Sequence, residues 1–131
     1  MEIAEFWQIV QTVAWGTPEG AHHLAGPYTG KMDVLGIQRT LREAYTDLQI
    51  EECALFASYL VRGLRDRVFA WETAGQRIGL PHEALDDLLS HVVGLGEAEY
   101  EACLQDPQRL LDRADAEEYE ENFRYCFERP V

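Results

Sequence analysis

The chain is 131 residues long, 47% of them are hydrophobic, and its formal charge is −13 because it holds 24 acidic and 11 basic side chains. This length suits one domain that buries roughly two-thirds of the surface exposed by its unfolded chain. The acidic surplus disfavours nucleic-acid phosphates and anionic membranes as partners and favours basic proteins or metal cations.

Two amphipathic helices and a long loop are predicted in the first part of the chain. The first helix ends at Gly16, and its apolar stripe consists of Ile3, Phe6, Val10 and Val13. Residues 16–31 hold glycine and proline at short intervals, which predicts an irregular loop. The second helix is predicted from Asp33 to about Thr46 or Asp47. Its apolar stripe is Val34, Ile37, Leu41, Tyr45 and Leu48.

The longest and most regular helix is predicted from Ile50 to about Thr73, across the middle of the domain. Its buried face is predicted to consist of Ile50, Cys53, Ala57, Leu60 or Val61, Leu64, Val68 and Trp71. Pro81 suits the first position of a further helix. The apolar positions of that helix are Leu85, Leu88, Leu89, Val92 and Val93.

Short helices are predicted at 97–105 and 117–128, separated by Asp106-Pro107, because proline biases the residue before it away from helix. No segment shows the alternation typical of a strand. The predicted fold is therefore all-α, a single compact domain over residues 1–131 with five to six helices and one long central helix.

Cellular location is predicted from the cysteines and from the start of the chain. Cys53, Cys103 and Cys126 are odd in number and widely spaced, so reduced and buried thiols are expected in place of a disulfide framework or a zinc site. The N-terminal segment is acidic, and no run of about 18 apolar residues occurs. We expect a cytoplasmic protein that does not enter a membrane.

One segment is close to a phosphate-binding loop. The stretch "AGPYTGKM" at 25–32 matches G-x-x-x-x-G-K-[ST] except at Ala25 and Met32, and methionine cannot ligate magnesium as a hydroxyl does. No strand precedes it, so we predict that no nucleotide binds there. His22-His23 in the same loop has too few neighbouring ligands for a metal site.

A metal or small-ligand site is one candidate on the helix at 82–91. His82 and Asp86 lie four residues apart, as do Glu83 and Asp87, and Asp87 and His91, so pairs of ligands share a helix face. The competing interpretation is that the acids lie at the start of a helix because carboxylates are favoured there.

Acidic and aromatic residues offer a second candidate site, for protein binding. Glu117, Glu118, Glu120 and Glu121 interleave with aromatic residues, which predicts a helix with charges toward water. Residues 97–131 carry eleven acids and four arginines, so an acidic docking face is expected there if one exists. Trp7 and Trp71 are candidate interaction residues, and a homodimer in which exposed aromatic residues such as Trp7 or Trp15 form the interface is a further possibility.

Several short elements match a family pattern in order along the chain. They are Phe6-Trp7, Glu51-Glu52 with Phe56, Phe69 with Trp71 and Glu72, Asp86-Asp87, Gly96, Tyr100-Glu101, Asp106-Pro107 and Leu110. Together they resemble the small bacterial proteins grouped as the domain of unknown function family numbered 4240. Ala74 replaces the family's second tryptophan, and the loop at 16–31 has no counterpart. The resemblance implies a bacterial all-helical domain and carries over no activity.

The sequence therefore favours a non-enzymatic protein-interaction module without a cofactor. An immunity-like or antitoxin-like protein that binds a basic partner is one concrete form of this hypothesis. The alternative is a divalent-metal-binding or small-ligand-binding protein that uses the helix at 82–91.

Overall fold

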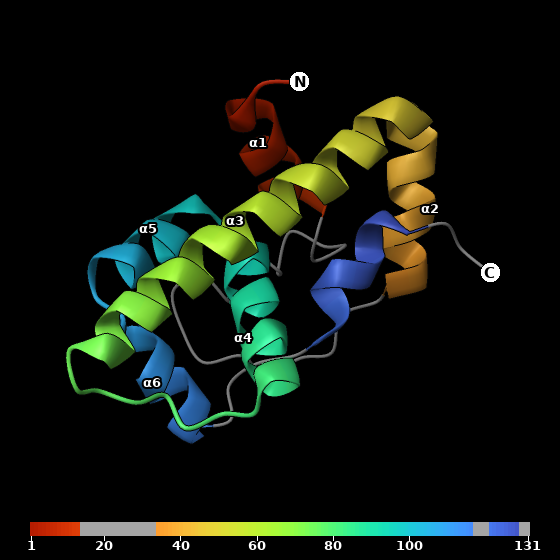
Figure 1. The fold of residues 1–131 in the computed structure, drawn as a ribbon. Coiled ribbons are helices and arrows are strands. Elements are labelled where there is room, and N and C mark those ends of the chain that lie inside the picture. The colour runs from red at the N-terminus through yellow and green to blue at the C-terminus, as the bar shows by residue number, and fades with distance from the viewer. Residues whose placement is uncertain (14–33, 117–120, 129–131) are drawn as a thin grey trace.

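The computed structural model describes residues 1–13, 34–116 and 121–128, and all of their regular structure is helical. The elements are α1 (Ile3–Val13), α2 (Val34–Ala44), α3 (Asp47–Thr73), α4 (His82–Leu95), α5 (Glu97–Gln105), α6 (Gln108–Ala116) and the 3-10 helix η2 (Glu121–Phe127). Figure 1 shows α3 running diagonally across the molecule, in front of α4 and α5. No strand occurs in the described ranges, which confirms the predicted all-α fold.

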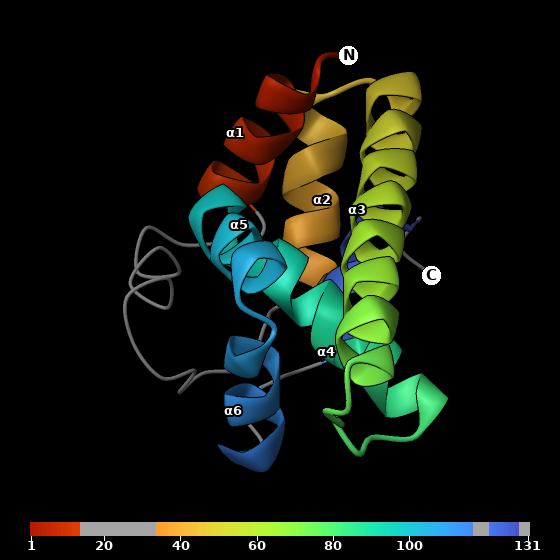
Figure 2. The same cartoon turned by 60° about the vertical axis from the view of Figure 1, so that its left-hand side comes forward.

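The long helix α3 begins at a capping box. Thr46 accepts a hydrogen bond from the backbone N–H of Gln49 at 3.2 Å, and the Gln49 side chain accepts one from the backbone N–H of Thr46 at 2.9 Å. The buried face of α3 consists of Ile50, Cys53, Leu60, Leu64 and Val68, all of which the periodicity predicts. In Figure 2, α3 runs along one side of the molecule for its whole length.

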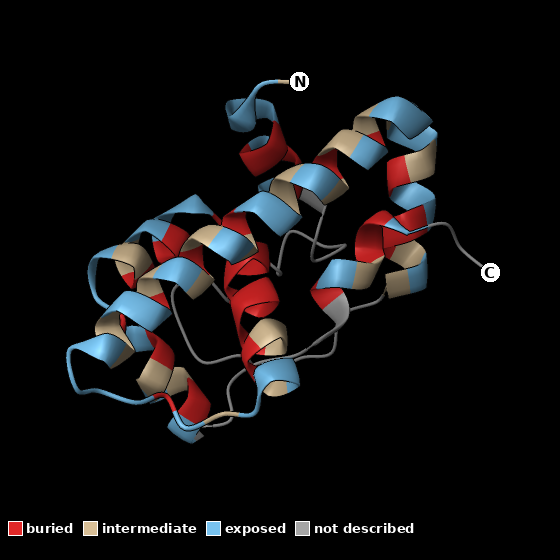
Figure 3. Ribbon diagram, viewed as in Figure 1, coloured by how far each residue is buried: buried red, intermediate tan, exposed pale blue. Residues whose placement is uncertain are grey.

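The helix α4 lies at the centre of the core. It contacts α1, α3, α5, α6 and η2, and every residue from 88 to 96 is buried. Figure 3 shows this buried segment passing behind α3. A helix that is apolar on all sides needs neighbours on all sides, and the leucine and valine residues of α4 meet this condition. Gly96 then adopts a φ of 113°, a backbone conformation that favours glycine, and the chain turns into α5.

The C-terminal part differs from the prediction. The predicted helix at 97–105 is confirmed as α5, but α6 (Gln108–Ala116) was not predicted. Pro107 lies directly before α6, where its missing N–H costs nothing, and Asp106 accepts a hydrogen bond from the backbone N–H of Gln108 at 3.1 Å. The segment 121–127 is a 3-10 helix, and residues 117–120 lie outside the described ranges.

The second helix also ends earlier than its apolar stripe suggests. Helix α2 ends at Ala44, and Leu48 belongs to α3, where its side chain is 64% exposed. The capping box at Thr46 explains this difference because it starts a new helix before the stripe is complete. Gln38 of α2 donates a hydrogen bond to the Tyr125 carbonyl at 2.9 Å and so ties α2 to η2.

The three cysteines are buried, as predicted, and none of them forms a disulfide bond. Burial raises the pKa of the Cys53 thiol to about 11, with a further contribution from the charge of Glu52. Burial, together with the charge of Glu99, raises the pKa of Cys103 to about 12. Both groups are therefore neutral thiols near pH 7.

Candidate functional site

The outer face of α3 carries large apolar side chains in contact with solvent. Leu48 is 64% exposed, Leu55 71%, Tyr59 67% and Phe69 50%. They project from the side of the helix opposite its buried face, where Arg62 and Asp66 are also exposed. We call these six residues the α3 outer face. Isolated exposed leucines are common, but several on one face of a rigid helix are typical of an interaction surface.

A shallow apolar groove of about 440 Å³ continues the α3 outer face toward the start of the chain. It is lined by Met1, Glu52, Leu55, Phe56 and Tyr59. The terminal amino group of Met1 forms an ion pair with Glu52 at 2.8 Å, which holds the first residue against α3. The hydrogen bond and the negative charge of Glu52 raise the pKa of this amino group above its ordinary value. The groove therefore adds apolar area beside Leu55 and Tyr59.

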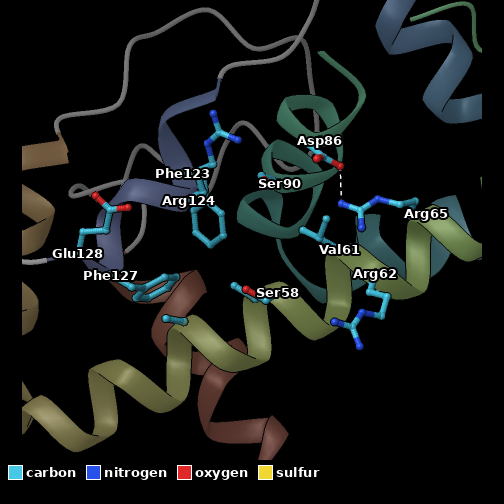
Figure 4. Close-up of a pocket in the computed structure, with 12 residues that line it drawn as sticks. Ser58, Val61, Arg62, Arg65, Asp86, Ser90, Phe123, Arg124, Phe127 and Glu128 are labelled. Atoms are coloured by element: carbon cyan, nitrogen blue, oxygen red, sulfur yellow. Dashed lines mark hydrogen bonds and ion pairs between the residues drawn. The ribbon is translucent and has the colours of Figure 1, made fainter. Parts of the chain in front are cut away.

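On the other side of α3, a cleft of about 450 Å³ lies between α3, α4 and η2. Figure 4 shows Phe123 and Phe127 at one end of the cleft, and Arg65 and Asp86 at the other end with Val61 beside Arg65. Ser90 is 6% exposed and also lines the cleft. Arg65 Nε is buried and lacks a hydrogen-bond partner within the described ranges.

The proposed metal ligands on α4 are divided between different environments. Arg65 forms an ion pair and a hydrogen bond with Asp86, and Arg124 pairs with Asp87 at 3.2 Å. His82 is 70% exposed and its Nε2 lies 3.7 Å from Asp86 Oδ2, whereas His91 is fully buried. The described residues contain no group of three or more His, Cys, Asp or Glu side chains placed to hold a metal ion. The described residues therefore do not bring the four side chains into one site: an arginine pairs with each aspartate, and one histidine is exposed while the other is buried.

A buried charge cluster joins α5 to α6. Glu99 is 6% exposed and pairs with Arg109 at 2.6 Å and with Arg113 at 3.2 Å. Burial alone would raise the pKa of Glu99, but the hydrogen bond from Arg109 and the charges of Arg113 and Arg109 outweigh it, so the pKa lies below its usual value. The cluster was not predicted, although Glu99 and the two arginines lie within one short segment. Its role is structural because it fixes two consecutive helices.

The sequence predicts that Trp7 is an exposed contact, and this prediction is wrong. Trp7 is only 8% exposed and packs against other aromatic side chains. Its ring lies 5.1 Å from that of Phe6 and 5.5 Å from that of Tyr100. Trp71 is half-buried against the core. Apolar residues at every third or fourth position of a helix form the face that packs against the core. Both tryptophans belong to such a face, which explains why neither is fully exposed.

Some candidate residues lie outside the residues that the structure describes. Glu117, Glu118 and Glu120 belong to the segment 117–120, which lies outside the described ranges, and Glu121 is the first residue of η2. The loop at 16–31, with its lysine and its two histidines, also lies outside the described ranges. The predicted acidic docking face and the loop therefore stay predictions.

Comparison with protein families, with curated proteins and with solved structures found no match. In the described part of the chain, no helix is both long and apolar enough to cross a membrane.

Proposed function

We propose that this chain is a non-enzymatic protein-interaction module of the bacterial cytoplasm that binds its partner through the α3 outer face. The observation that supports this proposal is the exposure of Leu48, Leu55, Tyr59 and Phe69, each at least half accessible, along one 27-residue helix. Burial of such side chains stabilises association by about 25 cal/mol per Å² of apolar surface before the costs of binding. The rigid helix lowers those costs because its backbone is ordered before the partner arrives.

The charge of the chain favours a basic partner. A formal charge of −13 attracts a positively charged protein over long range and repels nucleic acid. Glu51 and Asp66 are exposed on α3 and supply acidic groups next to the apolar side chains. An immunity-like or antitoxin-like role, in which the module covers a basic surface of another protein, is the form of the proposal that fits both features.

A leucine variant tests this proposal. Leu55→Ser removes the most exposed apolar side chain of the α3 outer face, and we expect it to weaken capture of the partner from the native host about tenfold or more. Leu35 of α2 is 43% exposed on another helix, so Leu35→Ser is the matched control and should capture the partner normally. Unfolding by urea should differ little between the two variants, since both positions are solvent-exposed.

Two outcomes would contradict the proposal. One is equal partner recovery by Leu55→Ser and by the wild type at low salt. The other is the failure of the wild type to recover any stoichiometric protein. Recovery should also fall as salt rises, because exposed charges are screened beyond about 10 Å at 0.1 M salt.

A second candidate function is small-ligand binding in the cleft between α3, α4 and η2. It is favoured by Arg65 Nε, a buried donor without a partner among the described residues, in a cleft that the hydroxyl-bearing Ser90 and the rings of Phe123 and Phe127 also line. Such a site suits a small carboxylate with an apolar group, and the volume of about 450 Å³ lies in the range of ligand pockets.

Thermal unfolding distinguishes this second candidate from a metal site. Phenylacetate at millimolar concentration should raise the melting temperature by a few degrees, and the neutral phenylacetamide should not. Ser90→Ala should reduce the phenylacetate effect. Equal shifts with the acid and the amide would rule out an anion site. A shift with zinc or manganese in tag-free protein would support the metal alternative at His82, Asp86, Asp87 and His91.

A further inference from the structure

The α3 outer face follows the spacing of a coiled-coil seam. Residues 48, 52, 55, 59, 62, 66, 69 and 73 are alternately four and three residues apart, which is the spacing of the contact positions in paired helices. The seam extends over nearly the whole of α3 (Asp47–Thr73). Figures 1 and 2 both show this helix at the surface along its length, so a second long helix can lie against it.

Three residues of this seam are charged, and one of them, Glu52, already pairs with the amino group of Met1. Arg62 and Asp66 are exposed, lie four residues apart, and form no ion pair with another described residue. Arg62 borders the cleft between α3, α4 and η2, and Figure 4 shows the end of its side chain extending from α3 away from Phe123. A positive and a negative charge at this spacing are complementary to the same two charges on an antiparallel copy of the helix.

We propose that the α3 outer face binds a second copy of this chain, with the two α3 helices antiparallel around a twofold axis near position 64. Arg62 then pairs with the partner's Asp66, and Asp66 pairs with the partner's Arg62. Tyr59 packs against the partner's Phe69 on each side of these ion pairs. Leu55 packs against the partner's Thr73 at the ends. This inference rests on the proposed use of the α3 outer face for protein binding, and it takes a second copy of the chain, in place of a basic protein, as the partner that covers this face.

Other antiparallel registers match the seam less well. If Tyr59 faces the partner's Leu55, then Arg62 faces the partner's Glu52, which the Met1 amino group already neutralises, and Asp66 faces the partner's Leu48, so a carboxylate is buried against an apolar side chain. If Tyr59 faces the partner's Arg62, then Leu55 faces the partner's Asp66 with the same cost. Only the register around position 64 pairs the two charges with each other and the two aromatic rings with each other.

Salt dependence distinguishes a second copy from a basic partner on the α3 outer face. The two copies carry −13 each, so their long-range repulsion falls as salt is added, and the dimer should be at least as strong at 0.3 M salt as at low salt. A basic partner held by charge should show the opposite salt dependence.

Charge reversal tests the proposed register. We expect sedimentation velocity to show a concentration-dependent dimer for the wild type, and about 100-fold or more weaker association for Arg62→Asp and for Asp66→Arg, because each places like charges opposite one another. An equimolar mixture of the two variants should dimerise again, since both of its charge pairs are then attractive. The double variant R62D/D66R should also form a homodimer.

The two single variants change the net charge of the chain in opposite directions. They therefore distinguish loss of the Arg62–Asp66 pairs from a change in the overall repulsion between the two copies. Asp66→Arg makes the chain less negative, which would strengthen any association limited by repulsion, yet here it should weaken the dimer. Arg39→Asp and Asp115→Arg make the same charge changes at exposed positions of α2 and α6 and should leave the dimer intact.

The outcomes for this inference and for the proposed function are distinct. A monomeric wild type at 0.3 M salt and high concentration overturns the homodimer. If the wild type is monomeric and Leu55→Ser captures less of a different protein than the wild type does, the proposed function is supported and only the homodimer is wrong. A wild-type dimer that survives Asp66→Arg, or single variants that fail to associate when mixed, overturns the proposed pairing.

Discussion

Replacing Glu99 by glutamine is expected to lower the free energy of unfolding by about 2–3 kcal/mol at pH 7. The wild-type carboxylate is 6% exposed and pairs with Arg109 and Arg113, so its loss leaves Arg113, whose side chain is 13% exposed, without a buried counter-charge. Arg109 is 47% exposed, and solvent screens its part of the cluster, which places the effect at the lower end for a buried ion pair. Urea unfolding measures this difference.

The same variant has a defined pH dependence. Because the folded-state pKa of Glu99 lies below the ordinary value of 4.5, its contribution is fully present above pH 4.5 and is lost as the pH falls through the folded-state pKa. The gap between wild type and E99Q should therefore close in acid. Glu101→Gln, on the exposed side of the same helix, is the control and should change stability by less than about 0.5 kcal/mol. A gap between wild type and E99Q that widens in acid would contradict this assignment.

Replacing Gly94 by alanine is expected to destabilise the fold by about 1–3 kcal/mol, although alanine favours helices. A Cβ atom at position 94 would lie 2.8 Å from Cγ and Cδ2 of Phe123 and 3.2 Å from its Cβ. Phe123 is 1% exposed and its ring meets that of Phe127 edge-on at 5.5 Å, so it has no room to turn aside. Either η2 or α4 must shift, and differential scanning calorimetry should record the loss.

Gly63→Ala provides the contrast within α3. Its added Cβ would meet only the hydroxyl of Tyr100 at 2.9 Å, the far end of a side chain that can move by a few tenths of an ångström. Helix propensity should then offset the contact, so this variant should lie within about 1 kcal/mol of the wild type. Shortening the opposing ring in the double variant G94A/F123L should cost less than the two single changes added together. Additive losses would show that Gly94 and Phe123 are not in competition for space.

Apolar periodicity correctly predicted the helices in which it is strong. It failed where a capping residue or a proline determines the position at which a helix begins. The end of α3 at Thr73 followed from its apolar positions, whereas its start at Asp47 depends on hydrogen bonds between Thr46 and Gln49. That pair has the spacing of a capping box and was legible in the sequence. Helix α6 was missed because Asp106-Pro107 was interpreted only as a break, although proline is also common just before a helix.

The candidate site was harder to predict than the fold. Leu55 and Tyr59 interrupt the polar side of α3, but a single sequence does not tell which of two apolar faces the rest of the chain covers. Trp7 and the α4 histidine His91 were proposed as site residues because of their chemistry, and both are buried in the core. The α3 outer face became recognisable only when the packing of α4 assigned the opposite side of the helix to the interior.

The three buried thiols make the opening of this fold measurable one element at a time. Cys53 lies in α3, Cys103 in α5 and Cys126 in η2, and all three are buried. A thiol-specific alkylating reagent reacts with the thiolate, so each cysteine must first be exposed by local or global unfolding. The alkylation rate of each cysteine, followed by mass spectrometry, therefore reports the free energy needed to open one element, and a dimer formed through α3 should slow the reaction of Cys53.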